Sequence, residues 1–144
     1  MKQARFELEI DSKVENLPLI ANFVDEVLER FGTDPASAYR VQLAVDEACT
    51  NVIKHAYGWG IGPMRLEMEL IGDNLVINVN DNGKPFAPDT IPPPDLDADL
   101  EKRRVGGLGI YFMKKIMDEV SYSFDSVAGN RLTMKKSITQ AEIK

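Results

Sequence analysis

The stretch Asp46-Glu-Ala-Cys-Thr-Asn-Val-Ile-Lys-His-Ala-Tyr57 decides the fold, because it places two polar side chains on one face of an otherwise apolar helix. Glu47 and Asn51 are four residues apart, so both side chains leave the helix on the same side. A carboxylate and a carboxamide one turn apart supply a proton acceptor and an oxygen ligand for a hard cation such as Mg²⁺. The pair alone carries little information, so its meaning depends on polar and glycine-rich signals further along the chain.

Hydrophobic periodicity around this stretch predicts an α+β domain. The expected architecture is a two-layer α/β sandwich in which a mixed, mostly antiparallel sheet carries its helices on one face. Alternating apolar residues predict strands, and apolar residues at helical spacing predict helices. The expected strands are 5–10, 64–71, 75–80, 121–126 and 132–138, and the expected helices are 17–31, 35–56 and 108–119. Asp34-Pro35 is expected to cap the second helix, and Gly72-Asp-Asn74 to form a tight hairpin turn.

Length and charge limit the range of functions. At 144 residues the chain fits one domain, and its net charge of −6 argues against nucleic acid as the main partner. No apolar run approaches the roughly 18 residues of a membrane span. The first residues also lack the apolar core of a signal peptide, so we expect a cytoplasmic protein without membrane contact. A single cysteine, Cys49, excludes an internal disulfide and leaves too little sulfur for a structural zinc site.

Two further motifs accompany the Glu47/Asn51 pair. Asp81-Asn-Gly83 ends an alternating strand, so the carboxylate can accept a hydrogen bond from a buried amino group while the glycine lets a planar ring approach. Gly106-Gly-Leu-Gly109 precedes a helix and gathers backbone amides at the positive end of its dipole, which favours an anion. Taken alone, each motif is more simply explained as an ordinary turn. Neither the P-loop nor the dinucleotide-binding pattern is present.

Regular periodicity disappears between these two motifs. Five of the eight prolines fall within ten residues there, namely Pro85, Pro88, Pro92, Pro93 and Pro94. Loops longer than about 15 residues inside a compact domain are usually functional or disordered. We expect residues 84–105 to form a lid or a long structured loop over the site.

The order of the motifs resembles the ATP-binding fold shared by gyrase, heat-shock chaperone, histidine kinase and mismatch-repair proteins. That order is Glu-x-x-x-Asn on a helix, Asp-x-Gly after a strand, and Gly-Gly-Leu-Gly before a later helix. Over nearly all of its length the chain is most similar to stand-alone anti-sigma-factor serine/threonine kinases of the RsbW and SpoIIAB kind. The similarity includes Asn51-Val-Ile-Lys-His-Ala-Tyr57 and Asp81-x-Gly-x-Pro-Phe86. It implies a histidine-kinase-like ATPase fold with ATP and Mg²⁺ as cofactors.

The resemblance also implies roles for the matching residues. Glu47 would be the general base that accepts the proton of a partner's serine or threonine hydroxyl, and Asn51 would ligate Mg²⁺. Asp81 would accept a hydrogen bond from the adenine amino group, with Gly83 giving the ring room. The phosphates would be wrapped beneath the lid by Gly106, Gly107, Leu108 and Gly109.

Five other polar residues have weaker assignments. Arg103 and Arg104 are candidates for the γ-phosphate, or they belong to a solvated hinge. Thr133 either assists at the adenine pocket or is an ordinary strand residue. Lys54 lies near the phosphates or in solvent, and His55 is expected to be a structural residue rather than a phosphoacceptor.

The resulting hypothesis is an ATP-dependent protein serine/threonine kinase that phosphorylates an anti-sigma-factor antagonist and also sequesters a sigma factor. A homodimer is expected from the resemblance alone. Two alternatives stay open at this point. One is a nucleotide-gated protein-binding module with little or no kinase activity, and the other is a detached ATPase domain of the histidine-kinase type.

Overall fold

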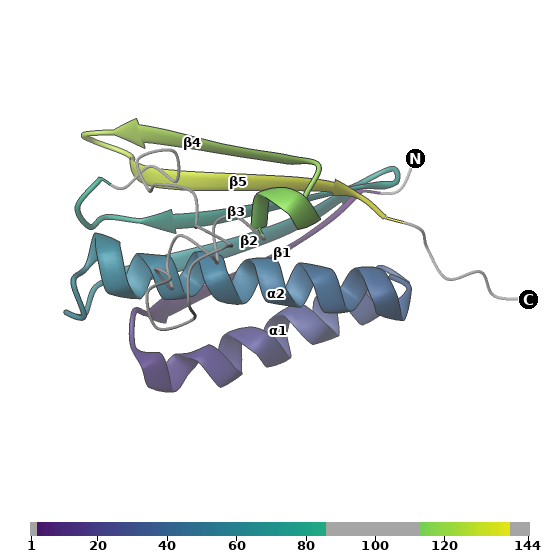
Figure 1. Ribbon diagram of the computed structural model, residues 1–144, viewed down its shortest axis with the longest axis horizontal. Helices are drawn as coiled ribbons and strands as arrows, with labels where there is room; N and C mark the ends of the chain where they lie inside the picture. Colours follow the sequence, from purple (N-terminus) through teal and green to yellow (C-terminus); the bar gives the residue numbers. More distant parts are fainter. Residues whose placement is uncertain (1–2, 86–112, 139–144) are drawn as a thin grey trace, which may run out of the picture.

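In the computed structural model, which describes residues 3–85 and 113–138, five strands form one sheet and two helices cover one of its faces (Figure 1). The strands are β1 (Gln3–Asp11), β2 (Pro63–Ile71), β3 (Asn74–Asp81), β4 (Glu119–Asp125) and β5 (Gly129–Ser137). They lie in the order β1-β2-β3-β5-β4, and all four pairings are antiparallel. The predicted α+β architecture is confirmed, with a more uniformly antiparallel sheet than the mixed one expected.

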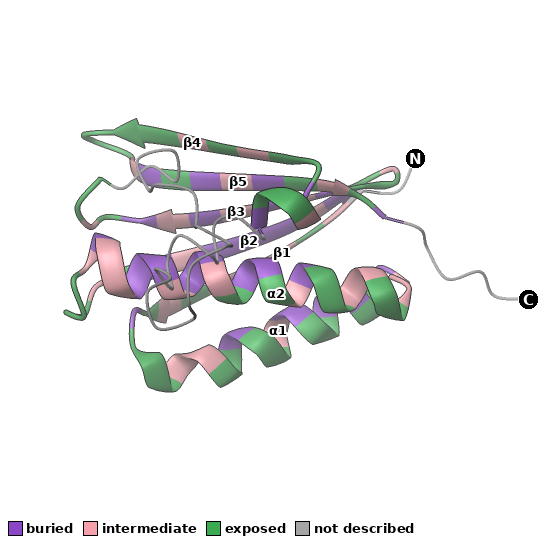
Figure 2. Ribbon diagram, viewed as in Figure 1, coloured by how far each residue is buried: buried purple, intermediate pink, exposed green. Residues whose placement is uncertain are grey.

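Successive side chains of each strand point to opposite faces of the sheet, which separates a helix-covered face from an open one. On β3, Leu75, Ile77 and Val79 are buried against the helices, and Asp81 ends the strand on that same face. Burial is strongest along the middle of the sheet, whereas the edge strand β4 is largely exposed (Figure 2). The neighbours of β3 at the Asp81 end, β2 and β5, therefore determine which side chains surround the Asp81 carboxylate.

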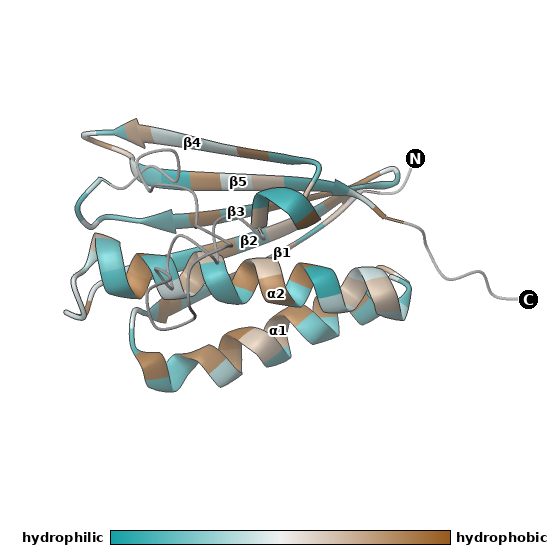
Figure 3. Ribbon diagram, in the orientation of Figure 1, coloured by the Kyte–Doolittle hydropathy of each residue, from teal (hydrophilic) through white to brown (hydrophobic). Residues whose placement is uncertain are grey.

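The two helices pack their apolar stripes on the sheet. A short 3-10 turn, η1 (Val14–Asn16), leads into α1 (Leu17–Arg30), and α2 (Pro35–Asn51) follows. Hydrophobic and hydrophilic bands alternate along both helices (Figure 3), as amphipathic packing requires. The predicted cap of α2 is confirmed, since Asp34 Oδ2 accepts a hydrogen bond of 3.1 Å from the Ser37 amide. Within the described ranges, no helix is long and apolar enough to cross a membrane.

The end of α2 changes from α-helical to π-helical geometry. The turn η2 (Val52–Ala56) continues the helix to the predicted end, and the Tyr57 amide closes it by donating to the Val52 carbonyl at 3.1 Å. Hydrogen bonds between residues five apart widen a turn, and such turns occur frequently at functional sites. Hydrophobic spacing alone does not distinguish this wider turn from a regular α-helical one.

Both predicted hairpins form, although β5 begins at Gly129 rather than at residue 132, and one predicted helix end is wrong. The β2–β3 hairpin turns through Gly72, which adopts the left-handed φ of 62° that glycine tolerates. The β4–β5 hairpin also forms as expected. The helix predicted to reach Glu119 ends earlier, because helical geometry in its described part covers only residues 113–116 and Glu119 already begins β4. The Asp118 amide donates to the Lys135 carbonyl at 2.9 Å, so strand pairing replaces the helical hydrogen bonds there.

A buried glutamate joins strands on the open face of the sheet. The side chain of Glu67 on β2 is only 5% exposed and is surrounded by cationic and amide groups. It pairs with Arg5 of β1, accepts from Asn80 of β3 at 2.9 Å, and accepts from Arg131 of β5 at 3.2 Å. Both carboxylate oxygens are therefore engaged, as a buried charge requires.

Replacing this glutamate should weaken the fold. We expect Glu67→Ala to lower the free energy of unfolding by about 1–3 kcal/mol, because half-exposed arginines lose a common partner that is itself buried. Urea denaturation measures the change. Glu69→Ala on the same strand face is the matched control and should change stability by less than about 0.5 kcal/mol. Equal effects of the two substitutions would contradict a specific role for the Glu67 network.

Candidate nucleotide site

Asp81 is a buried carboxylate with one oxygen already engaged. The residue is 8% exposed at the end of β3. Its Oδ1 accepts hydrogen bonds from the Gly83 amide at 2.9 Å and from Asn130 Nδ2 at 2.8 Å. No donor among the described residues reaches Oδ2, so this oxygen can accept from a ligand. Burial raises the pKa of the Asp81 carboxyl, and the two hydrogen bonds oppose that shift.

Asn130 is the site residue that sequence reasoning missed. It lies opposite Asp81 in the β3–β5 pairing and is 2% exposed. Its Nδ2 also donates to the Gly83 carbonyl at 3.0 Å, so the amide holds both the carboxylate and the following loop. Three acceptors surround Nδ2, which fixes the orientation of the amide. Counting back in steps of two from the apolar residue Leu132 would have placed Asn130 on the buried face.

Gly83 is required by the close approach of two chain segments. A Cβ atom at this position would lie 2.4 Å from the carbonyl oxygen of Ala56. The same carbonyl accepts a hydrogen bond of 2.7 Å from the Lys84 amide. The loop after β3 therefore packs directly on the end of the helix. This contact explains why residue 83 is a glycine, whether or not a planar ring also binds beside it.

The Glu47/Asn51 pair lies on the last turns of α2. Asn51 is 4% exposed, whereas Glu47 is partly exposed. Burial and the neighbouring Asp46 charge raise the pKa of the Glu47 carboxyl, while Lys54 and a hydrogen bond from Asn51 lower it. A carboxylate with a raised pKa is a stronger proton acceptor near neutral pH than an ordinary glutamate.

An apolar pocket connects the end of α2 with Asp81. Its polar wall is formed by Asn51 and Asp81. The remaining lining residues are Ala48, Val52, Ala56, Met113, Tyr122 and Leu132. The volume is about 20 Å³, which is enough for a single water molecule. A purine ring enters this pocket only when wall side chains move, and the unbranched Met113 is the most adaptable of them.

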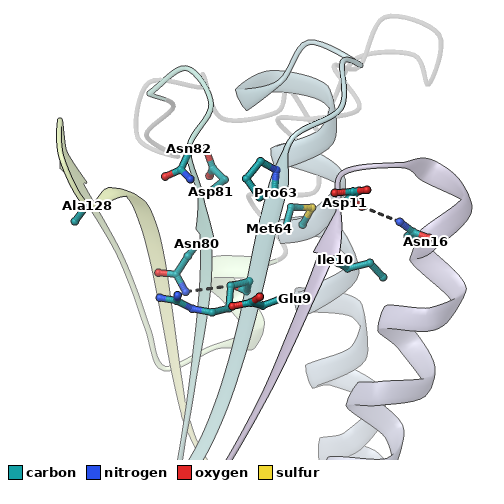
Figure 4. Close-up of a pocket in the computed structure, with 11 residues that line it drawn as sticks. Glu9, Ile10, Asp11, Asn16, Pro63, Met64, Asn80, Asp81, Asn82 and Ala128 are labelled. Atoms are coloured by element: carbon teal, nitrogen blue, oxygen red, sulfur yellow. Dashed lines mark hydrogen bonds between the residues drawn. The ribbon is translucent and has the colours of Figure 1, made fainter.

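A larger hollow opens at the same end of the sheet, toward β1. Its volume is about 630 Å³, and Figure 4 shows Asp81 and Asn82 at the end of β3 beside its wall. Its lining residues include three acidic ones, Glu9, Asp11 and Asp81, and one basic one, Arg65. A triphosphate would meet net negative charge there. The hollow is large enough for a nucleotide, but its acidic lining would repel the phosphates. The small apolar pocket is therefore the better candidate for binding a nucleotide base.

The structure corrects the assignment of Thr133. Asn130 and Leu132 are buried on the helix-covered face of β5, and Thr133 points to the opposite face. There its Oγ1 donates to Asn78 Oδ1 at 2.7 Å. Because the sheet separates the two, Thr133 does not line the apolar pocket that contains Asp81.

Several predicted residues lie outside the described part of the chain. They are most of the expected lid 84–105, both arginine candidates and the glycine-rich motif: Arg103, Arg104, Gly106, Gly107, Leu108 and Gly109. Lys54 and His55 are described and lie partly buried in η2. Burial and the adjacent Lys54 lower the pKa of His55, which favours the neutral imidazole at neutral pH.

Asp81→Asn should separate binding from stability. A group whose folded-state pKa is raised favours folding when protonated, and this contribution is lost as the pH rises through the folded-state pKa. The neutral amide should therefore leave the melting temperature at neutral pH unchanged or higher. Calorimetric titration should show ATP affinity reduced by about tenfold or more. A large loss of stability together with normal ATP binding would contradict this reading of Asp81.

Asn130→Asp should make ATP binding depend on pH. Two carboxyl groups at hydrogen-bond distance share one proton, and a protonated Asp at 130 can replace the lost amide donor. We expect ATP affinity relative to wild type to recover as the pH falls from about 8 to about 5.5. Asn130→Ala is the control and should bind weakly at both values. The same dependence of ATP affinity on pH in Asn130→Asp and Asn130→Ala would refute the role of Asn130 as a hydrogen-bond donor.

Comparison with known proteins assigns this chain to a family. A family model described as the histidine kinase-like ATPase domain matches residues 10–136. The serine-protein kinase RsbW of Listeria monocytogenes is 31% identical over 142 residues, which covers 95% of this chain and 89% of that protein. The serine-protein kinase RsbW of Staphylococcus aureus is 30% identical over 149 residues, covering 99% of this chain and 92% of that protein.

A solved structure agrees at the level of the fold. The crystal structure of the RsbU and RsbW domains of a Mycobacterium tuberculosis protein superposes with a TM-score of 0.67 at 16% identity. The superposition covers 98% of this chain and 35% of that longer chain. The chain therefore belongs to the histidine kinase-like ATPase family and, within it, to the RsbW group of serine-protein kinases.

Proposed function

We propose that this chain transfers the γ-phosphate of ATP to a serine or threonine of an anti-sigma-factor antagonist, and that it also sequesters a sigma factor. The observation that carries the proposal is the apolar pocket, which the buried residues Asn51 and Asp81 both line. The kinase names of the relatives support the reaction. The antagonist and the sigma factor rest on the resemblance of the sequence motifs.

Asp81 is suited to recognise adenine. Its Oδ2 accepts without a competing donor from the described residues, and the 6-amino group of adenine is a donor. The surrounding apolar wall suits a planar base, and few polar groups fix its orientation. Guanine presents an acceptor at the same position, so the carboxylate favours ATP over GTP.

Asn51 is the residue that would hold Mg²⁺. Its buried amide supplies one oxygen ligand, and the described residues contain no cluster of three or more acidic, histidine or cysteine side chains able to hold a metal alone. Mg²⁺ commonly binds through one or two protein oxygens together with substrate phosphates and water. When bound, it neutralises phosphate charge during transfer. One oxygen from Asn51 would therefore suit an ion whose other ligands come from the nucleotide and water.

Glu47 is the proposed general base. It lies one helical turn before Asn51, so both side chains leave the same face of α2. In this role Glu47 accepts the proton of the substrate hydroxyl as the hydroxyl oxygen attacks the γ-phosphorus and the bond from that phosphorus to the ADP oxygen breaks. Because its pKa is raised, transfer should slow as the pH falls through that pKa and Glu47 becomes protonated.

Further parts of the proposal concern the assembly. We place the protein in the cytoplasm as a homodimer of single ATP-binding domains, each spanning residues 1–144. Residues 84–105 act as the ATP lid, and Gly106, Gly107, Leu108, Gly109 and Arg104 contact the phosphates. The net charge of −6 supports protein partners over nucleic acid. A phosphorylated antagonist gains negative charge, which weakens its affinity for a site that holds ADP.

Glu47→Gln tests the reaction directly. We expect the rate of phosphate transfer to the cognate antagonist to fall by about 10² or more, because general-base catalysis contributes about that much. ATP affinity should change by less than about threefold, since Glu47 is not assigned to the base or the metal. Radiolabelled ATP follows transfer, and calorimetry follows binding. Asp46→Asn, which removes the adjacent exposed carboxylate, is the control and should retain transfer.

Two outcomes would redirect the proposal. Normal transfer by Glu47→Gln would remove Glu47 from the role of general base. Tight ATP binding by the wild-type protein without any transfer would favour the nucleotide-gated binding module. Labelled phosphohistidine on a partner would instead favour the detached histidine-kinase-type domain.

A further inference from the structure

The Tyr57 hydroxyl bridges two strands at the point where they separate. It donates to the Pro63 carbonyl at 2.7 Å, where β2 begins, and accepts from the Asn82 amide at 2.9 Å, just after β3 ends. The last pair in the β2–β3 register is Met64 with Asp81, so Pro63 and Asn82 would form the next pair. The hydroxyl is inserted between them in place of a direct backbone hydrogen bond.

Tyr57 is itself fixed to the end of the helix that carries Asn51. Its amide closes the π-helical turn by donating to the Val52 carbonyl at 3.1 Å. Its ring packs so closely on Gly62 that a Cβ atom there would lie 2.2 Å from a ring carbon. The ring therefore has little freedom to move, and the hydroxyl is held in one place.

A second link runs beside the first. The Ala56 carbonyl accepts from the Lys84 amide at 2.7 Å, and Gly83 packs on the Ala56 backbone. Two consecutive helix-end residues thus hold the loop on both sides of Gly83. The first link uses a side-chain hydroxyl and can be removed by substitution, whereas the second uses only backbone atoms.

We propose that Tyr57 is a positioning residue of the nucleotide site, which keeps Asp81 at the correct distance from Asn51 by stopping the β2–β3 ladder at Asp81. The inference rests on the proposed ATP site and adds a residue to it. Without the hydroxyl, the Asn82 amide and the Pro63 carbonyl can pair directly. The loop after Asp81 would then shift toward β2 and away from the helix end, and the carboxylate would move with it.

Tyr57→Phe tests the proposal because it removes only the hydroxyl oxygen. We expect ATP affinity to fall by about three- to tenfold, the effect of one misplaced hydrogen-bonding group. Calorimetric titration with ATP should be made at a temperature where every variant is folded. Hydrogen exchange of the Asn82 amide should change in the same variant, which reports the contact directly.

Val24→Ala is the control for a general loss of stability. Val24 is fully buried on α1 and does not line the pocket, so its truncation weakens the core without touching the loop. We expect Val24→Ala to lower the melting temperature but to keep ATP affinity within about twofold of wild type.

The outcomes separate this inference from the proposed function. If the wild-type protein does not bind ATP, the proposed function itself fails. If the wild type binds and Tyr57→Phe binds equally well, the positioning role of Tyr57 is wrong. An equal loss of ATP affinity in Tyr57→Phe and Val24→Ala would also overturn it, because the effect would then reflect stability alone.

Discussion

Burial of the Asp81 carboxylate is the constraint on which the rest of the site depends. An ionised carboxylate away from water is costly unless hydrogen bonds compensate it. Among the described residues, Asn130 and the Gly83 amide supply that compensation, and both donate to Oδ1. The first partner requires β5 to lie beside β3, and the second requires a tight loop after β3. Strand order and loop geometry are thus both tied to one charged group.

The helix end and this loop constrain each other through backbone contact. The Ala56 carbonyl meets Lys84 and leaves no space for a side chain at Gly83. Since Ala56 is the last residue of the π-helical turn η2, the wider turn sets where this carbonyl points. Asn51 lies immediately before that turn. The same local geometry therefore positions both the amide proposed for the metal and the loop that carries the carboxylate proposed for adenine.

Periodicity predicted most of the fold because burial acts on one face of each element. The alternation of β3 and the helical spacing of α1 are direct consequences of this one-sided burial. The predictions were wrong where the sequence allows two similar assignments for neighbouring residues. Thr133 and Asn130 are both polar residues of β5, and Thr133 was the predicted one, although alternation from the apolar residue Leu132 places only Asn130 on the face toward the helices. The early end of the helix before Glu119 depends on Asp118 pairing with β5, a long-range contact that local spacing does not encode.

The two buried carboxylates of the described residues show how stability and function divide between the faces of the sheet. Glu67 on the open face engages both oxygens with residues from neighbouring strands, so nothing remains for a ligand. Asp81 on the helix-covered face leaves one oxygen without a donor from those residues and lies in an apolar wall. A fully paired buried charge is explained by the fold, whereas a half-paired one is not. Among the described residues, the free acceptor capacity of Asp81 Oδ2 is therefore the physical reason to propose the nucleotide base beside it.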